Sequence, residues 1–178
     1  PSRFSWISNV ALVSRNRPPR IRIVSRPEIS LPKIENQGLV NPITHEMLRR
    51  ELRKGRKALY ISKNSPHQLN AQFAPVKDNM TAFWLSPRPQ DDCIPPMNLE
   101  TFESRIVKFL SENEFPIVVL NGFDVLYSWN GLRPVIDSLK RARESLGNAE
   151  FFISLDPNEH NPGSVGALER ISDEVVCT

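Results

Sequence analysis

Two short apolar runs separated by a helical pattern constrain the fold of this chain more than any other feature. Residues 115–122 read Phe-Pro-Ile-Val-Val-Leu-Asn-Gly, and residues 151–156 read Phe-Phe-Ile-Ser-Leu-Asp. Between them, Leu132, Val135 and Leu139 recur at the spacing of an amphipathic helix. Continuous apolar strands that alternate with helices are typical of a parallel sheet buried on both faces. The pattern therefore predicts an α/β fold in which helices sandwich a mostly parallel sheet.

Turn and cap residues place further elements on either side of this pair. Asn41 is predicted to cap a helix that ends near Lys54, where Gly55 suits a left-handed terminator. Ser65 is predicted to cap a second helix, with proline at its first position, and Asn98 a third. The other predicted elements are strands at residues 38–40, 58–62, 81–85 and 174–178, and helices at residues 130–147 and 165–171.

The N-terminal segment lacks the pattern of a folded domain. A diproline at residues 18–19 blocks helix formation between Arg17 and Arg20. Residues 20–23 alternate basic and apolar side chains as a strand does, so this piece is predicted to join a sheet edge of a partner or of the chain itself. We interpret residues 1–36 as a basic extended arm or linker, and residues 37–178 as the α/β domain.

Charge is distributed unevenly along the chain. The net charge is +3, yet residues 1–60 hold 13 Lys and Arg against 4 Asp and Glu. A basic end on an acidic body predicts contact with an anionic partner, either an acidic protein, nucleic acid or a membrane surface. No apolar stretch approaches the roughly 20 residues that span a bilayer. Two scattered cysteines favour a reducing cytoplasm.

Ten cations form the main candidate binding set. Two groups are expected to converge on a surface suited to anions, and the alternative is an ordinary solvated helix face. They are Arg15, Arg17, Arg20 and Arg22 in the arm, and Arg49, Arg50, Arg53, Lys54, Arg56 and Lys57 on and just after the first helix. Aromatic residues with base-stacking spacing do not accompany them, which gives no support to single-strand nucleic-acid binding.

A second candidate site lies where strands are expected to end. Asn121 and Asp124 follow one predicted strand, and Asp156 and Glu159 follow another. Parallel sheets place ligands in the crevice at the carboxyl ends of their strands. The alternative is a pair of polar turns, in which Gly122 takes a positive φ. Histidine and cysteine spacing predicts no metal site, and we predict no cofactor.

Several strand ends and caps resemble one known family. They lie at residues 58–62, 64–66, 84–86, 117–123, 130–132 and 154–157. In order and spacing these segments resemble the archaeal family called "domain of unknown function 835", over roughly residues 38–176. The resemblance implies the same α/β layout and brings no catalytic motif with it.

That family is similar to a reduced KaiC or RecA type ATPase domain, and the departures carry the functional information. Residues 40–44 read Val-Asn-Pro-Ile-Thr, without the glycines and lysine of a phosphate loop. Asn121 stands where such ATPases carry an acidic residue for magnesium. The resemblance therefore implies a degenerate RecA-like shell without the ATPase site.

These observations lead to one functional hypothesis and two alternatives. We expect a non-catalytic interaction or signalling module that binds another macromolecule, foremost a protein, through its basic arm and first helix, as a subunit or accessory factor of a larger assembly. One alternative is a nucleotide-sensing or hydrolytic protein that uses the strand-end crevice. The other is a cytoplasmic domain tethered to a membrane, with Phe4 and Trp6 near the lipid.

Overall fold

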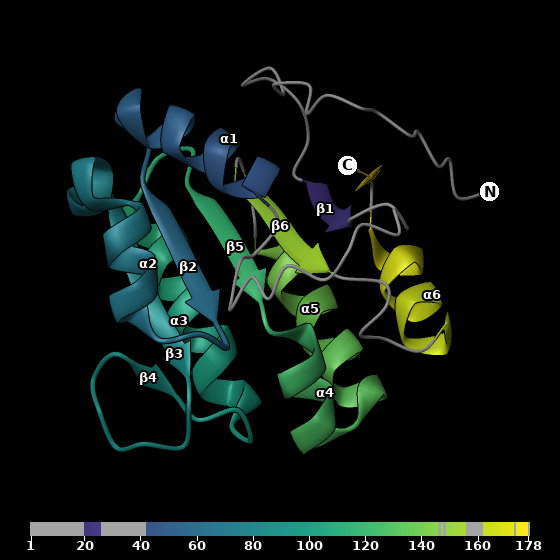
Figure 1. Cartoon of the computed structure of the whole chain (residues 1–178). Coiled ribbons are helices and arrows are strands. Elements are labelled where there is room, and N and C mark those ends of the chain that lie inside the picture. The colour runs from purple at the N-terminus through teal and green to yellow at the C-terminus, as the bar shows by residue number, and fades with distance from the viewer. Residues whose placement is uncertain are drawn as a thin grey trace, which may run out of the picture.

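A seven-stranded parallel sheet forms the centre of the molecule (Figure 1). The computed structural model describes residues 20–25, 42–145, 147, 149–155, 162–172 and 174–177. The strands are β1 (Arg20–Ser25), β2 (Ala58–Ser62), β3 (Met80–Leu85), β4 (Cys93–Ile94), β5 (Ile117–Asn121), β6 (Glu150–Leu155) and β7 (Glu174–Cys177). Their order is β4-β3-β2-β5-β6-β1-β7, and every pairing is parallel. The predicted α/β class is confirmed.

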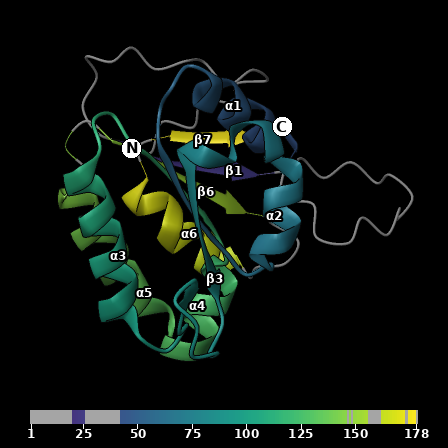
Figure 2. The same ribbon diagram turned by 90° about the vertical axis from the view of Figure 1, so that its left-hand side faces the viewer.

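Helices cover both faces of this sheet (Figure 2). One face carries α1 (Pro42–Arg53), α2 (Pro66–Gln72) and the 3₁₀ helix η1 (Ala74–Asn79). The other face carries α3 (Leu99–Glu112), α4 (Phe123–Asn130), α5 (Leu132–Glu144) and α6 (Pro162–Ile171). Right-handed crossovers between parallel strands place helices in this way.

Strand β5 shows why the sheet is buried on both sides. Val118 and Leu120 pack into the core under α3 and α5, whereas Ile117 and Val119 pack under α1 and α2. Successive side chains of a strand point to opposite faces, so an uninterrupted apolar run serves two cores. All five residues of β5 are buried, as the sequence pattern predicted.

Two of the three predicted N-terminal caps, Ser65 and Asn98, form in the structure, and the third, Asn41, lies outside the described residues. The Oγ of Ser65 accepts a hydrogen bond from the amide of His67, and the Oδ1 of Asn98 accepts one from Thr101 at 3.0 Å. Gly55 ends the first helical segment at φ +88°. These short polar residues satisfy amide groups that have no partner within the helix.

Part of the N-terminal segment belongs to the sheet. Strand β1 lies between β6 and β7, with Arg20 opposite Glu150 and Ser25 opposite Leu155. Of the two partners predicted for residues 20–23, the structure therefore shows this chain's own sheet. The strand predicted at residues 38–40 lies outside the described residues.

Three elements were not predicted. Helix α4 begins directly after Gly122 and ends at Gly131, which has φ +83°, so the polar turn predicted after β5 is also a helix start. The short strand β4 interrupts the proline-rich loop of residues 86–97, because Cys93 and Ile94 pair with Trp84 and Leu85. The third is η1, which leads from α2 into β3.

Candidate functional site

Helix α1 separates a buried face from a charged face. Leu48 and Leu52 are fully buried, and Met47 is nearly so. Arg50 and Arg53 are exposed on the opposite side. Neither of these two arginines forms a hydrogen bond or an ion pair with the described residues. The packing of the apolar side thus fixes the helix and leaves two guanidinium groups facing solvent.

Arg56 does not belong with the exposed cations, in contrast to the prediction. Its side chain is 14% exposed, and its Nη1 contacts Glu51 at 3.2 Å and Glu150 at 2.7 Å. Its Nε and Nη2 both donate hydrogen bonds to the carbonyl oxygen of Phe115. Sequence position gave no signal for this role, because Glu150 and Phe115 are distant in the chain. Arg56 is an internal tie between α1, β6 and the segment before β5.

The carboxylate of Glu51 is the acidic centre of this tie. Burial raises its pKa, but hydrogen bonds from Lys54 and Arg56 outweigh that effect and hold the pKa below its usual value. The side chain is 8% exposed and contacts Lys54 Nζ at 2.9 Å. Because paired carboxylates stay ionised, Glu51 neutralises part of the positive charge that the sequence places here.

The remaining cations on and just after α1 differ in their burial and in the contacts that they make. Arg49 is half-buried and lies 5.6 Å from the ring centre of Phe73. Lys54 is half-exposed beside Glu51, and Lys57 donates a hydrogen bond to Asn79 Oδ1 at 2.7 Å. We use "α1 basic face" for the exposed set of Arg50, Arg53, Lys54 and Lys57. Lys77, exposed on the adjoining η1, adds a cation that sequence reasoning missed.

The arm cations are only partly placed. Arg15 and Arg17 lie outside the described residues. Arg20 and Arg22 lie on β1, for which the structure describes the backbone and its pairing. The predicted convergence of arm and helix on one surface therefore stays a prediction.

At the predicted strand-end crevice, the described polar residues contact other side chains of the chain. Asn121 is 8% exposed, and its Nδ2 donates a hydrogen bond to Ser62 Oγ at 3.4 Å. The carboxylate of Asp124 forms an ion pair with Lys63 at 3.0 Å. Asp156 and Glu159 lie outside the described residues. Of the four predicted crevice residues, the two that are described thus have bonded partners.

Close packing also occurs at Gly122, which directly follows β5. A Cβ atom at Gly122 would lie 2.6 Å from Leu85 Cδ1, and φ there is +152°. The positive φ predicted for this glycine is confirmed. The indole Nε1 of Trp84 donates a hydrogen bond to the Lys63 carbonyl at 3.2 Å, which brings the end of β3 to the same place. The positive φ and the contact with Leu85 both favour glycine at this position.

The buried face of α1 carries a histidine. His45 is 3% exposed, and its Nε2 lies 2.8 Å from the hydroxyl of Tyr60. Burial and the positive charge of Arg49 lower the pKa of His45 to about 4. His45 is therefore neutral at pH 7 and belongs to the core with Tyr60 and Phe73. The described residues hold no group of three His, Cys, Asp or Glu that is arranged to bind a metal ion.

One family matches most of the chain. Residues 40–171 match the family described as "Protein of unknown function (DUF835)". The chain belongs to this family. No curated protein matches the chain. In the described parts of this family member, no helix has the length and apolar character needed to cross a membrane.

The matched region contains both candidate surfaces. It begins two residues before α1 and ends with α6. It therefore includes the α1 basic face, the Arg56 tie and the packed strand ends at Asn121. Strands β1 and β7 lie outside the matched region of this DUF835 domain.

Proposed function

We propose that this DUF835 protein is a non-catalytic interaction module, an accessory subunit of a larger assembly, and that its α1 basic face binds an acidic protein surface. The observation that supports the proposal is the exposure of Arg50 and Arg53 on a helix whose other side is anchored in the core. Guanidinium groups bind carboxylates in a bidentate manner. A rigid helix lowers the entropy cost of ordering them.

An acidic protein fits this face better than a nucleic acid does. Glu46 is exposed one helical turn before Arg50, and Asp78 is exposed beside Lys57. Such mixed charge complements a protein surface of mixed charge, whereas phosphate backbones favour uninterrupted positive charge. In the described part of the chain, the exposed large apolar side chains are Met97, Val107 and Trp129, none of which lies on α1.

We also propose that the protein has no catalytic activity. It is supported by the bonded state of Asn121 and Asp124 and by the close contact of Gly122 with Leu85. A magnesium-nucleotide site needs open carboxylates and unpaired backbone amides. We further propose that the domain is a degenerate relative of the KaiC and RecA ATPases from an archaeal lineage. The parallel sheet and the side-chain amide of Asn121 support this relationship to the ATPases.

The proposed location is the cytoplasm. In support, the thiol of Cys93 is buried and free, as is common in a reducing compartment. Anionic lipid remains the alternative partner for the α1 basic face, and the experiment below includes it as an outcome.

Charge-variant capture from native cells tests the proposal. The full chain is tagged and compared with an Arg50→Ser/Arg53→Ser variant, with nuclease and detergent present. Because both arginines are exposed, thermal stability should stay within about 0.5 kcal/mol of the original. We expect a stoichiometric protein partner that the variant loses.

A matched control uses two exposed cations on the other face of the sheet. An Arg133→Ser/Lys140→Ser variant on α5 removes the same net charge. We expect this control to retain the partner. Equal loss in both variants would indicate general electrostatic attraction. A partner that disappears with nuclease or detergent would contradict an acidic protein and indicate nucleic acid or lipid.

Calorimetry with ATP and magnesium tests the rival, nucleotide-sensing function. We expect no saturable heat from the original protein. Saturable heat that an Asp124→Ala variant loses would support the strand-end crevice and contradict the proposed absence of a nucleotide site.

A further inference from the structure

One edge of the central sheet is only partly paired. Strand β3 pairs with β2 along residues 80–84, but on its other side only Trp84 and Leu85 pair with β4. On that side, residues 80–83 have no strand next to them among the described residues. They are exposed or half-buried, whereas every residue of β2 and β5 is buried. At this edge β3 runs between α3 and α2 (Figure 2).

The backbone of Ala82 faces the open part of this edge. The amides of Trp84 and Ser86 donate hydrogen bonds to the carbonyl oxygens of Asp92 and Ile94, on the β4 side. Because backbone direction alternates along a strand, the amide and the carbonyl of Ala82 point to that side too. No described residue bonds to either group there. An extended segment can therefore continue the sheet at Ala82, by the strand addition that many peptide-binding domains use.

Strand β3 lacks the features that commonly protect an open edge. Natural sheets block such edges with charged side chains or proline, because unpaired backbone groups attract other strands. Residues 80–85 read Met-Thr-Ala-Phe-Trp-Leu and contain neither. Strand β4 covers two positions only. The remaining part of the edge is available for pairing, which favours a binding role.

An arginine of α3 gives this edge a charge preference. The guanidinium group of Arg105 lies 5.1 Å from the ring centre of Phe83, whose side chain belongs to the α3 side of the sheet. No described carboxylate forms an ion pair with Arg105, and the neighbouring Glu103 bonds to Arg141 instead. Stacking on a ring leaves the N–H groups of a guanidinium available, so Arg105 can bind a carboxylate in a bidentate manner.

The other side of β3 carries charges of both signs. Arg88 lies 5.0 Å from the ring centre of Trp84, but the same exposed loop also holds Asp91 and Asp92. A carboxylate on the added strand is therefore favoured on the α3 side. A second copy of the chain fits this edge less well, because antiparallel pairing at Ala82 would bring two Arg105 side chains to the same face of the joined sheet.

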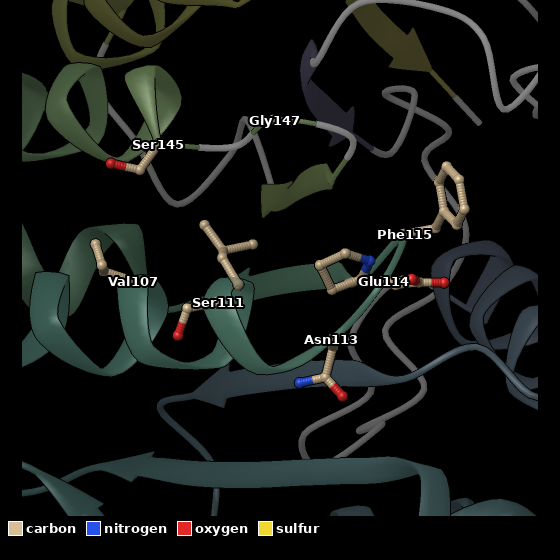
Figure 3. Close-up of a pocket in the computed structure, with 9 residues that line it drawn as sticks. Val107, Ser111, Asn113, Glu114, Phe115, Ser145 and Gly147 are labelled. Atoms are coloured by element: carbon tan, nitrogen blue, oxygen red, sulfur yellow. The ribbon is translucent and has the colours of Figure 1, made fainter.

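This edge is distinct from the pocket at the end of the same helix (Figure 3). The pocket has a volume of about 470 Å³, and Val107, Ser111 and Asn113 line it together with Ser145. Arg105 is not among its lining residues. Helix α3 thus directs Arg105 to the β3 edge and not to the pocket.

We propose that the open edge of β3 binds an extended acidic segment of a partner protein as an additional strand. One residue of this segment pairs with Ala82 through the backbone, and its acidic neighbour points to the α3 side and binds Arg105. The edge is separate from the α1 basic face, so this inference goes beyond the proposed function and can fail independently of it.

Fluorescence polarisation of a labelled octapeptide of alternating Glu and Val, titrated with the full chain, tests the inference. We expect saturable binding with a Kd below about 1 mM. Arg105→Gln should weaken binding at least about fivefold, whereas Arg133→Gln, at an exposed position on α5, should leave it unchanged. An octapeptide of alternating Lys and Val should bind at least about tenfold more weakly than the acidic one.

Two further changes test the backbone pairing. Ala82→Pro removes an edge-facing amide that does not pair with β2, so it should weaken binding at least about tenfold while the sheet is kept. N-methylation tests the same pairing from the peptide, because alternate amides of a strand face opposite edges. Methyl groups on one alternate set of amides should abolish binding, and methyl groups on the other set should not. If Ala82→Pro does not fold, the two methylated peptides alone test the pairing.

Four results would overturn the inference. They are the absence of saturable binding, equal binding of the Lys-Val peptide, equal binding of both methylated peptides, and loss of binding in Arg50→Ser/Arg53→Ser, which would place the peptide on the α1 basic face. A dimer in sedimentation velocity that Ala82→Pro dissociates would also contradict it and assign the edge to a second copy. Circular dichroism checks the fold of each variant.

Discussion

The guanidinium group of Arg56 donates two hydrogen bonds to the carbonyl oxygen of Phe115, from Nε at 3.0 Å and from Nη2 at 2.8 Å. Phe115 has φ +50°, a conformation that costs a bulky residue roughly 1–3 kcal/mol. The same guanidinium contacts Glu51 and Glu150. Arg56 therefore stabilises a strained backbone while it joins α1 to β6.

Replacing Arg56 should destabilise the fold strongly. Arg56→Ala leaves the carboxylates of Glu51 and Glu150 without this partner in a poorly hydrated position, so we expect a loss of about 3 kcal/mol in the free energy of unfolding. Urea denaturation at pH 7 measures it. Arg141→Ala, which removes an exposed pair with Glu103, is the control and should have a much smaller effect. Equal effects would show that Arg56 is an ordinary surface cation.

A methyl group at position 122 should also be costly. In Gly122→Ala the Cβ would lie 2.6 Å from Leu85 Cδ1, at a φ that disfavours side chains. We expect a loss of roughly 2–3 kcal/mol by urea denaturation. Adding Leu85→Ala removes the clash, so the double variant should lose less than the sum of the single losses. Additive losses would exclude steric contact as the cause.

His45 makes stability depend on pH. Its folded pKa of about 4 lies below its value of 6.5 when unfolded, so protons bind the unfolded chain more readily. The contribution of neutral His45 to the free energy of unfolding is complete above pH 6.5 and is lost as pH falls toward 4. Between pH 7.5 and pH 5 we expect a decrease of about 2 kcal/mol in the free energy of unfolding.

His45→Gln should remove most of that pH dependence, measured by urea denaturation at both pH values. His67, exposed on α2, provides the matched control, because His67→Gln should keep the dependence. An unchanged pH dependence in His45→Gln would mean that other groups cause it.

The alternation of strands and helices could be predicted because it depends on neighbouring residues. The apolar run of β5 and the caps Ser65 and Asn98 report local backbone preference, and the structure confirms them. Helix α4 was missed because Gly122 signals a turn equally well. The two-residue strand β4 was missed because its pairing with Trp84 and Leu85 comes from tertiary packing.

The candidate site could be predicted less completely, for a physical reason. Sequence shows that Arg50, Arg53 and Arg56 are cations, but exposure depends on which residues approach them in space. Glu150 lies 94 positions from Arg56 in the chain, so their ion pair has no local signal. The packing of Leu85 against Gly122 is equally non-local, and it changes the interpretation of the strand-end crevice.

Site-specific photo-crosslinking in native cells tests the central claim most directly. A photoreactive amino acid replaces Arg53 on the α1 basic face or, as control, Lys140 on α5. The account predicts a covalent adduct with one protein from position 53 and none from position 140. An adduct from position 140 with none from position 53 would contradict the claim that the α1 basic face binds the partner.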